Sequence, residues 1–396
     1  MTLASDRQNV QKFATTVVDQ VQSTMYGVDG VIRLCLVALY VKGHVLLEGN
    51  PGLGKTSLVN TLAKTLNLPF RRIQFTPDLL PSDITTTPKL SHENGGTRIE
   101  LAPGPIFTSL LLADEINRAT QKTQSALLEA MGERQVTVNG ETTRLDADGA
   151  PFMVLATQNP VDHEGTYDLP EAQLDRFLFK VLMPTPNSDA IERILRKTAG
   201  VLSGGTDGDA AELTDPPPLE NRAQTVERFK LYHGLIRQVR PQPSVQAHIE
   251  NLFQATNGQM GALRSNREAS AEVLRLQGQL RYGLGPRAAT ALLISAKAWT
   301  LLFSLPTVRL GDADIVVSAD ALAAVALPVL RHRLKLKYSA LDEYRKKASA
   351  GGEEGAIDAF TMDLLRACIP SGPGMEPEYG RAFVKALERI QNEHPY

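Results

Sequence analysis

An eight-residue stretch, GNPGLGKT (49–56), fills every defined position of the phosphate-binding pattern G-x-x-x-x-G-K-[ST]. The apolar run HVLLEG (44–49) precedes it and TSLVNTLAKTL (56–66) follows, so the pattern lies between an expected strand and an expected helix. Glycines allow backbone N–H groups to turn toward a phosphate, and the N-terminus of a helix adds positive potential there. The motif therefore predicts a sheet-and-helix fold that binds a nucleotide.

The residues of this motif have separate expected roles. Lys55 should reach the terminal phosphates of the nucleotide, and the Thr56 hydroxyl can hold Mg²⁺. We therefore expect a nucleotide and magnesium as ligands. The residues expected to line the nucleotide are Gly49, Asn50, Pro51, Gly52, Leu53, Gly54, Lys55, Thr56 and Ser57.

Short apolar runs divide the first 185 residues, and longer segments separate them. The runs are HVLLEG (44–49), RRIQFT (71–76), SLLLADEI (109–116), FMVLATQN (152–159) and FLFKVLM (177–183). Nearly continuous apolarity is typical of strands that are buried on both faces of a parallel sheet and wrapped by helices. We therefore predict an α/β fold for this part of the chain.

Polar side chains end two of these runs. Asp114 and Glu115 end the third run, and Thr157 and Asn159 end the fourth. Doubly wound sheets bind ligands beyond the C-terminal edge of their strands, where these side chains should meet. Asp114 suits the water shell of Mg²⁺, Glu115 can deprotonate an attacking water, and Asn159 could hold that water or a phosphate. The alternatives are a carboxylate pair that only ends a strand and a turn at Asn159-Pro160.

The amino-acid composition and the periodicity of the sequence change after residue 189. Gly, Asp and Pro enrich residues 200–225, which is typical of a loop or linker. Helical periodicity marks 226–239, 286–303 and 318–336, so a helical second domain is expected. The predicted parts are an α/β nucleotide-binding core over 1–190, a linker over 191–225, a helical domain over 226–340 and a C-terminal extension over 341–396.

The charge of the chain gives little support to a nucleic-acid partner. Its 396 residues carry a formal net charge of -2, and the pI is near 6.4, so there is no net field to attract a polyanion. The most basic strip is RHRLKLK (331–337), which we interpret as a solvated helix end.

The cysteines and histidines argue against several other classes of site. Cys35 and Cys368 are the only cysteines, too few for a disulfide framework. The seven histidines lack paired ligand spacing, and DHE (162–164) is too crowded for a metal cage, so no metal beyond magnesium is expected. The N-terminus is polar, and no apolar stretch nears membrane-spanning length. We therefore expect a soluble cytoplasmic protein.

Together these motifs resemble the MoxR family of AAA+ ATPases, with an α/β P-loop core and a helical lid. The resemblance is close over 10–190 and looser over 225–340. It rests on the stretches HVLLEGNPGLGKT (44–56), FRRIQFTPDLLPSDITTT (70–87), GPIFTSLLLADEINRATQKTQSALLEAMGERQVTVNG (104–140), VLATQNPVDHEGTYDLPEAQLDRFLFKV (154–181), GPRA (285–288) and VLRHRL (329–334).

The resemblance implies ATP as the nucleotide and a role for each candidate residue. The implied pairs are Lys55 and Thr56 as Walker A, Asp114 and Glu115 as Walker B, with Asn159 as sensor 1. Arg176, next to Asp175 in PEAQLDRF (170–177), falls where such ATPases carry an arginine finger. Such a finger acts on the nucleotide of a neighbouring subunit and supplies about 10³–10⁵ in rate.

Two points about the arginines stay open in the sequence. Arg176 could instead be only the ion-pair partner of Asp175. Arg287 falls where the family carries sensor 2, and it could serve either its own subunit or the neighbour.

A hexameric ring is also implied. Residues 76–105 match the family's insertion in the second helix, and 133–148, which alternate around Asn139-Gly140, match the hairpin before sensor 1. In the related enzymes both projections line a central pore. The implied function is ATP-driven remodelling or maturation of partner proteins, often with von Willebrand factor A domains.

Two functions from other classes compete with this chaperone. A nucleic-acid motor of the AAA+ class would need basic pore loops, whereas the 133–148 hairpin sets two arginines against four carboxylates. The residues concerned are Arg134 and Arg144 against Glu133, Glu141, Asp146 and Asp148. A P-loop small-molecule kinase would need an acceptor pocket and no neighbour's arginine, and full activity as a monomer would favour it.

Overall fold

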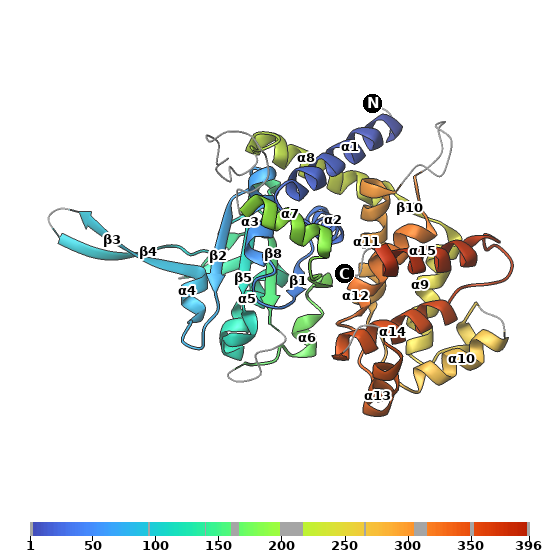
Figure 1. Cartoon of the computed structure of the whole chain (residues 1–396). Helices are drawn as coiled ribbons and strands as arrows, with labels where there is room; N and C mark the ends of the chain where they lie inside the picture. The colour runs from blue at the N-terminus through green and yellow to red at the C-terminus, as the bar shows by residue number, and fades with distance from the viewer. Residues whose placement is uncertain are drawn as a thin grey trace. The chain divides into compact units, whose positions relative to one another are not determined.

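A computed structural model of the chain (Figure 1) describes residues 3–93, 96–138, 140–159, 166–198, 217–264, 267–304, 315–348 and 352–393. The DHE stretch at 162–164 and most of the 200–225 linker lie outside the described residues. The chain forms two compact units. The helical unit contains Met1–Lys12, Pro170–Lys180 and Tyr232–Pro395, and the sheet unit contains Phe13–Leu169 and Val181–Leu231.

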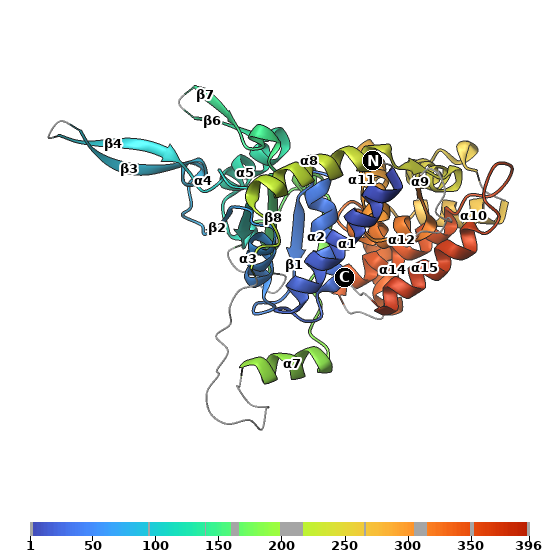
Figure 2. The same cartoon turned by 90° about the horizontal axis from the view of Figure 1, so that it is seen from above.

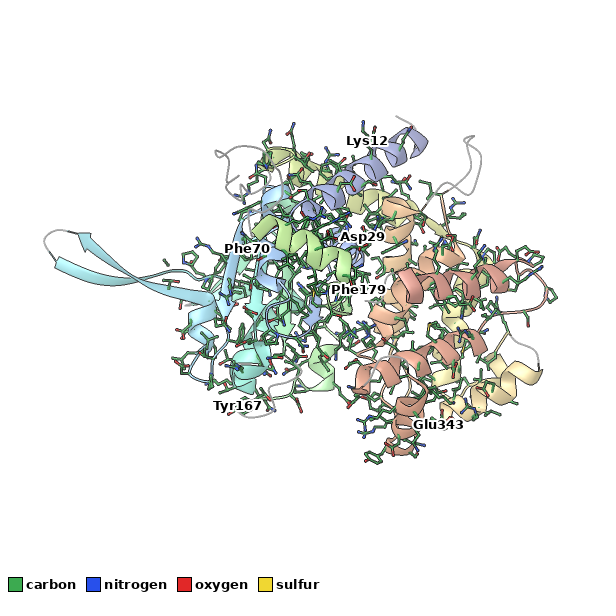
Figure 3. The ribbon with its side chains drawn as sticks, in the orientation of Figure 1. Lys12, Asp29, Phe70, Tyr167, Phe179 and Glu343 are labelled. Atoms are coloured by element: carbon green, nitrogen blue, oxygen red, sulfur yellow. The ribbon has the colours of Figure 1, made fainter. Side chains whose placement is uncertain are left out.

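A five-stranded sheet forms the centre of the sheet unit. In spatial order its strands are β2 (Phe70–Gln74), β5 (Leu110–Asp114), β8 (Met153–Gln158), β1 (Val45–Glu48) and β9 (Phe179–Leu182). The pairs β2 with β5, β5 with β8 and β8 with β1 are parallel. Every residue of β5 is buried, as expected for a strand covered on both faces. The predicted strands and the α/β fold are confirmed. Phe70 and Phe179 mark the starts of β2 and β9 (Figure 3).

Helices and short turns connect these strands. The helices of the sheet unit are α2 (Asp29–Tyr40), α3 (Lys55–Thr65), α4 (Pro81–Thr85), α5 (Gln121–Glu133) and α7 (Ser188–Thr198), with 3₁₀ turns at Ile116–Arg118 and Ala147–Gly149. Helix α8 (Arg222–Gln238) begins in the sheet unit and ends in the helical unit. Helix α1 (Leu3–Gln22) begins in the helical unit and ends in the sheet unit. Cys35 is buried in the apolar α2, and burial raises the pKa of its thiol to about 12.

Two antiparallel hairpins extend from the sheet unit (Figure 2). The first, β3 (Thr86–Glu93) with β4 (Gly96–Pro103), lies within the predicted insertion and follows α4. The second, β6 (Gln135–Val138) with β7 (Glu141–Arg144), lies between α5 and β8. Gly140 adopts a positive φ of 84° at its turn, which glycine tolerates without steric cost.

The helical unit is built around α11 and α12, which pack against each other, and α15 packs on α12. Its helices are α6 (Glu171–Leu174), α9 (Pro243–Thr256), α10 (Arg267–Gln277), α11 (Pro286–Phe303), α12 (Ala319–Leu330), α13 (Tyr338–Lys347), α14 (Gly352–Ala367) and α15 (Tyr379–Glu393), with a 3₁₀ turn at Met260–Ala262. A two-stranded parallel pair joins β10 (Arg240–Pro241) to β11 (Val316–Val317). The expected helical second domain is confirmed.

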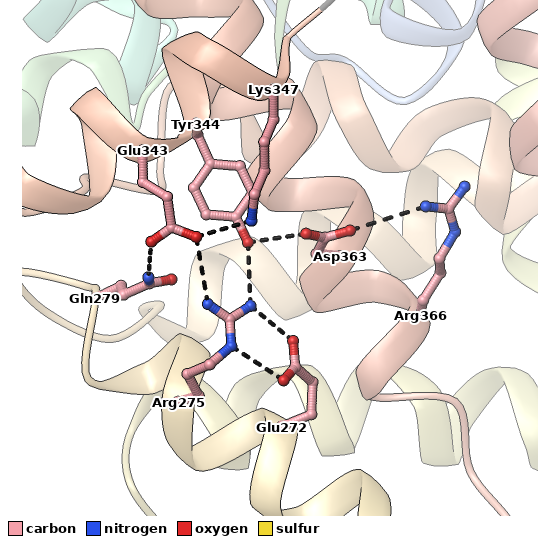
Figure 4. A network of polar contacts seen from close by, with 8 residues as sticks. All are labelled: Glu272, Arg275, Gln279, Glu343, Tyr344, Lys347, Asp363 and Arg366. Atoms are coloured by element: carbon pink, nitrogen blue, oxygen red, sulfur yellow. Dashed lines mark hydrogen bonds and ion pairs between the residues drawn. The ribbon is translucent and has the colours of Figure 1, made fainter.

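A polar network joins α10, α13 and α14 at one end of the helical unit (Figure 4). Arg275 contacts Glu272 at 2.7 Å, Glu343 at 3.7 Å and the Tyr344 hydroxyl at 3.4 Å. Tyr344 in turn donates to Asp363 at 2.8 Å. Arg275 is largely solvent-exposed, so its ion pairs contribute little to stability.

The basic strip at 331–337 is not a solvated helix end, and that interpretation was wrong. Arg331 and His332 are 2% and 4% exposed, and the Arg333 side chain is 6% exposed. These three side chains bind backbone carbonyls and carboxylates of the helical unit. The first three residues of the strip are therefore buried, mostly by partners that lie far away in the sequence, whereas Lys337 at its end is exposed.

Candidate functional site

The phosphate-binding motif forms a loop between β1 and α3 in the sheet unit. Gly52 and Gly54 have φ angles of 82° and 76°, a left-handed conformation that side chains rarely adopt. Gly54 is also the N-cap of α3, so the loop leads directly to the N-terminus of that helix. These glycines therefore give the loop the backbone path that a phosphate-binding loop requires.

Lys55 lies between this loop and the end of β8. Its Nζ donates hydrogen bonds to the Gly49 carbonyl at 2.6 Å and to the Gln158 carbonyl at 3.4 Å. Burial lowers the pKa of Lys55, and the nearby carboxylates of Asp114 and Glu115 partly offset that effect. The predicted phosphate-binding lysine therefore lies in the electrostatic field of the predicted Walker B pair.

A hydroxyl group joins the two carboxylate residues at the end of β5. Thr157 Oγ1 donates to Asp114 Oδ1 at 2.6 Å and accepts a bond from the Glu115 backbone N–H at 2.9 Å. Glu115 has φ 57° and ψ 48°, an uncommon left-handed conformation for a residue other than glycine. Strained backbone of this kind clusters at functional sites and persists only where neighbours hold it. Thr157 is one such neighbour, because it binds the strained N–H directly.

Strand β2 supplies a second set of contacts to the same carboxylates. Arg72 binds Asp114 Oδ2 through Nε at 3.0 Å and through a terminal nitrogen at 2.6 Å. Gln74 donates to Glu115 Oε2 at 2.8 Å, and Arg118 Nε lies 3.3 Å from that oxygen. Both carboxylates are thus held from the neighbouring strand as well as from β8.

The remaining candidates of the sheet unit lie close to these groups in the fold. Asn159, 8% exposed, directly follows β8, and Thr56 is half-buried in the first turn of α3. Among the other motif residues, Asn50 and Ser57 are exposed and Leu53 is half-buried. The structure therefore gathers Lys55, Asp114, Glu115 and Thr157 through direct contacts or charge, and places Asn159 and Thr56 on the same elements.

The donor groups fit a nucleotide with Mg²⁺. The loop offers backbone N–H groups and a lysine for phosphates, and Asp114 and the Thr56 hydroxyl are hard oxygen donors. Mg²⁺ in such sites binds one or two protein oxygens and keeps phosphate oxygens and waters as its other ligands. Separately, no group of three or more carboxylate, histidine or cysteine side chains that could hold a metal ion occurs among the described residues.

The two predicted arginines belong to the helical unit. Arg176 is exposed, immediately after α6. Its neighbour Asp175 is held by Arg333, whose Nε lies 2.8 Å from Oδ1, and by Arg287, whose terminal nitrogen lies 3.6 Å from Oδ2. Arg287 therefore lies beside the segment that carries Arg176, and the Asp175 carboxylate binds one arginine from α11 and one from the turn after α12.

Sequence reasoning missed several of these contacts. It placed Thr157 at the edge of the sheet but gave it no role, and it gave none to Arg72 or Gln74. Arg72 and Gln74 are two residues apart on β2, so they share one face of the strand. Two polar residues on one face of a strand, beside the strand that carries the carboxylates, were the available signal.

No helix among the described residues has the length and apolarity to cross a membrane.

Comparisons with known proteins agree with this site. A family model described as the ATPase family associated with various cellular activities (AAA) matches residues 44–179, which include both carboxylates and the phosphate-binding loop. The chain is 42% identical to YeaC of Bacillus subtilis over 322 residues, covering 81% of this chain and 86% of that protein.

Two further relatives carry the same conclusion. Chaperone MoxR1 of Mycobacterium tuberculosis is 35% identical over 322 residues, covering 81% of this chain and 75% of that protein. A crystal structure of a Cytophaga hutchinsonii protein assigned as an ATPase superposes with a TM-score of 0.69 at 35% identity, covering 86% of this chain and 92% of that chain. The chain therefore belongs to the MoxR family of AAA+ ATPases.

Proposed function

We propose that this chain hydrolyses ATP with Mg²⁺ as a subunit of a hexameric ring that remodels or matures partner proteins. The observation that supports hydrolysis best is the strained Glu115, bound by Thr157 and Gln74 next to Asp114 and within the field of Lys55. A carboxylate fixed in this way beside a phosphate-binding loop can take a proton from an attacking water.

Each candidate site residue of the sheet unit has a proposed role in this reaction. Lys55 and the loop N–H groups bind the β- and γ-phosphates, and Thr56 and Asp114 hold Mg²⁺, which neutralises phosphate charge when bound. Glu115 orients the attacking water and accepts its proton. Asn159, at the end of β8, holds that water or the γ-phosphate through its amide.

The arginines of the helical unit would complete the site of a neighbouring subunit. Arg176 is exposed, and a guanidinium supplied from outside neutralises charge as the γ-phosphate bond breaks. Because Arg287 contacts Asp175, directly before Arg176, we propose that both arginines serve the same nucleotide. This arrangement requires heterologous contacts between subunits, which close into rings.

The hairpin β6–β7 favours a protein partner over a nucleic acid. Arg144 binds Asp146 at 2.6 Å, and Lys42 lies 3.6 Å from the same carboxylate. Arg134 donates to the Lys42 carbonyl. Both arginines of the hairpin thus have partners within the chain, whereas a nucleic-acid motor would need them for phosphates. A chaperone role also agrees with the name of the MoxR1 relative, and partners with von Willebrand factor A domains are the first to test.

Separating ATP binding from ATP turnover tests this function. Lys55→Ala should lose ATP binding, because Lys55 contacts phosphates in the ground state. Glu115→Gln should bind ATP normally and lose about 10²–10⁴ in kcat, because it removes the base and keeps the shape. Near-normal turnover by Glu115→Gln would refute the assigned base. The ATP-bound Glu115→Gln protein is also suited to capture partner proteins for identification.

A further inference from the structure

Three consecutive residues after α12, Arg331, His332 and Arg333, hold the segment that carries Arg176. All belong to the helical unit. The segment runs from Glu171 in α6 to Lys180 in β9. An inference about its role rests on the proposed function of Arg176.

Arg333 makes the most contacts with this segment. Its Nε donates to Asp175 Oδ1 at 2.8 Å, and its terminal nitrogens donate to the carbonyls of Phe177 at 2.7 Å and Leu178 at 3.1 Å. Burial lowers the pKa of Arg333, and Asp175 partly offsets this effect. The guanidinium therefore binds the chain immediately before and immediately after Arg176.

The two residues before Arg333 extend this contact. Arg331 donates to the Lys180 carbonyl at 2.8 Å, and Asp358 binds the same guanidinium at 2.8 and 2.9 Å. His332 donates from Nε2 to the Phe177 carbonyl at 3.0 Å, and burial lowers its pKa, so the ring is neutral. Lys180 adds an ion pair to Glu354 at 2.6 Å.

Arg176 is an exposed residue within this fixed segment. Phe177 and Phe179 are fully buried, and the Arg176 N–H donates to the Gln173 carbonyl at 3.1 Å. At the start of α6, the Tyr282 hydroxyl binds Glu171. The backbone on both sides of Arg176 is thus bound to the helical unit, while its side chain points to the surface.

Stability alone is a weak reason for this arrangement. Burying a guanidinium carries a large desolvation cost, and well-packed apolar residues of similar volume are often as stabilising. Arginine differs from them because its fork of donors fixes several acceptors in one geometry. A segment that must present a catalytic guanidinium within a fraction of an ångström requires that property.

We propose that Arg331, His332 and Arg333 are positioning residues for Arg176. Through their contacts, the helical unit of one subunit fixes the position in which Arg176 faces the nucleotide of the next subunit. Arg333 is the principal residue of the three, because it contacts both flanks of Arg176.

A double-mutant cycle tests this proposal. Arg333→Lys keeps the charge near Asp175 but cannot reach several carbonyls at once, so the single-turnover rate should fall about 10- to 100-fold with ATP affinity unchanged. On an Arg176→Ala background, Arg333→Lys should cause no further loss, because it acts only through Arg176. Equal losses in both backgrounds would show a general structural role and overturn the proposal. So would an unchanged rate in Arg333→Lys alone.

Matched variants separate positioning from loss of folding. Arg275→Lys makes the same replacement within the network of Figure 4, which does not contact residues 170–180, and should keep its rate. Asp175→Asn weakens the same contact from the other side and should repeat the behaviour of Arg333→Lys, even if that variant folds poorly. If Arg176→Ala itself keeps full activity, the proposed arginine finger fails and this inference fails with it. If only Arg176→Ala is impaired, the inference alone fails.

Discussion

The hydroxyl of Thr157 donates a 2.6 Å hydrogen bond to Asp114, and the same oxygen accepts the N–H of the next residue, Glu115. One buried side chain on β8 thus fixes the carboxylate proposed to hold Mg²⁺ and the backbone of the proposed base. Glu115 has a left-handed backbone conformation, which persists only where neighbouring groups hold it, and Thr157 is such a neighbour.

Thr157→Val should therefore damage the site without changing its shape. Valine matches threonine in volume but has no hydroxyl, so the Glu115 N–H and one oxygen of Asp114 lose their partner. We expect a loss of about 1–3 kcal/mol in the free energy of unfolding and about 10² in kcat. Thr157→Ser keeps the hydroxyl and should retain most activity. Steady-state kinetics and chemical denaturation measure both effects, and wild-type kcat in Thr157→Val would contradict this role.

Arg72 should compete with Mg²⁺ for Asp114. Its guanidinium binds Oδ2 at 2.6 Å, while its own side chain is 47% exposed. An ion pair of this exposure contributes about 0.2–1 kcal/mol, so Arg72→Met should lower the Mg²⁺ concentration for half-maximal hydrolysis by up to about fivefold. A magnesium titration of the ATPase rate checks this. A higher Mg²⁺ requirement would instead indicate that Arg72 orients Asp114 for the metal.

The buried histidines predict a loss of stability in mild acid. Burial in the helical unit lowers the pKa of His248 from 6.5 to about 4, and its hydrogen bond to the Leu365 carbonyl offsets only part of that effect. Below pH 6.5 His248 becomes protonated in the unfolded chain, whereas in the folded chain it stays neutral down to about pH 4. The free energy of unfolding is therefore highest above pH 6.5 and falls as the pH is lowered from 6.5 to 4. His248 alone should contribute about 2 kcal/mol to this loss at pH 5.

Denaturant unfolding at several pH values measures this effect. Replacing His248 by Gln should reduce the slope of stability against pH between 6.5 and 4. An unchanged slope would mean that folding does not shift the pKa of His248. His44 gives an independent check, because burial lowers its pKa to about 3 in the sheet unit.

The fold was predictable because its signals are local. Strands such as β5 and β8 are continuous apolar runs, and the phosphate-binding loop needs glycine at positions such as Gly52 and Gly54, where φ is positive. These features depend on residues that are close in the sequence, so a single sequence is enough to predict them.

The contacts that failed prediction join distant segments. The sequence predicted a solvated strip at Arg331 and Arg333, because their acceptors at Asp175 and Lys180 lie about 150 residues earlier in the chain. Amino-acid composition cannot predict that backbone carbonyls of a distant segment will accept hydrogen bonds from a buried guanidinium. Residues 170–180 lie inside the α/β core predicted over 1–190, yet they group with the helical unit, through contacts that also join distant parts of the sequence.

The central claim is that Arg176 completes the active site of a neighbouring subunit. The most direct measurement is the ATPase rate of mixed rings of Arg176→Ala and Glu115→Gln subunits, against mixing ratio, with mixed assembly verified by sedimentation. Each pure variant should be nearly inactive. In mixed rings an Arg176→Ala subunit keeps its own Glu115 and can receive Arg176 from a Glu115→Gln neighbour. About a quarter of the interfaces pair the variants productively at equal mixing, so activity should recover up to about that fraction. A hump above the line joining the pure variants is the predicted result, and a straight line would contradict the account.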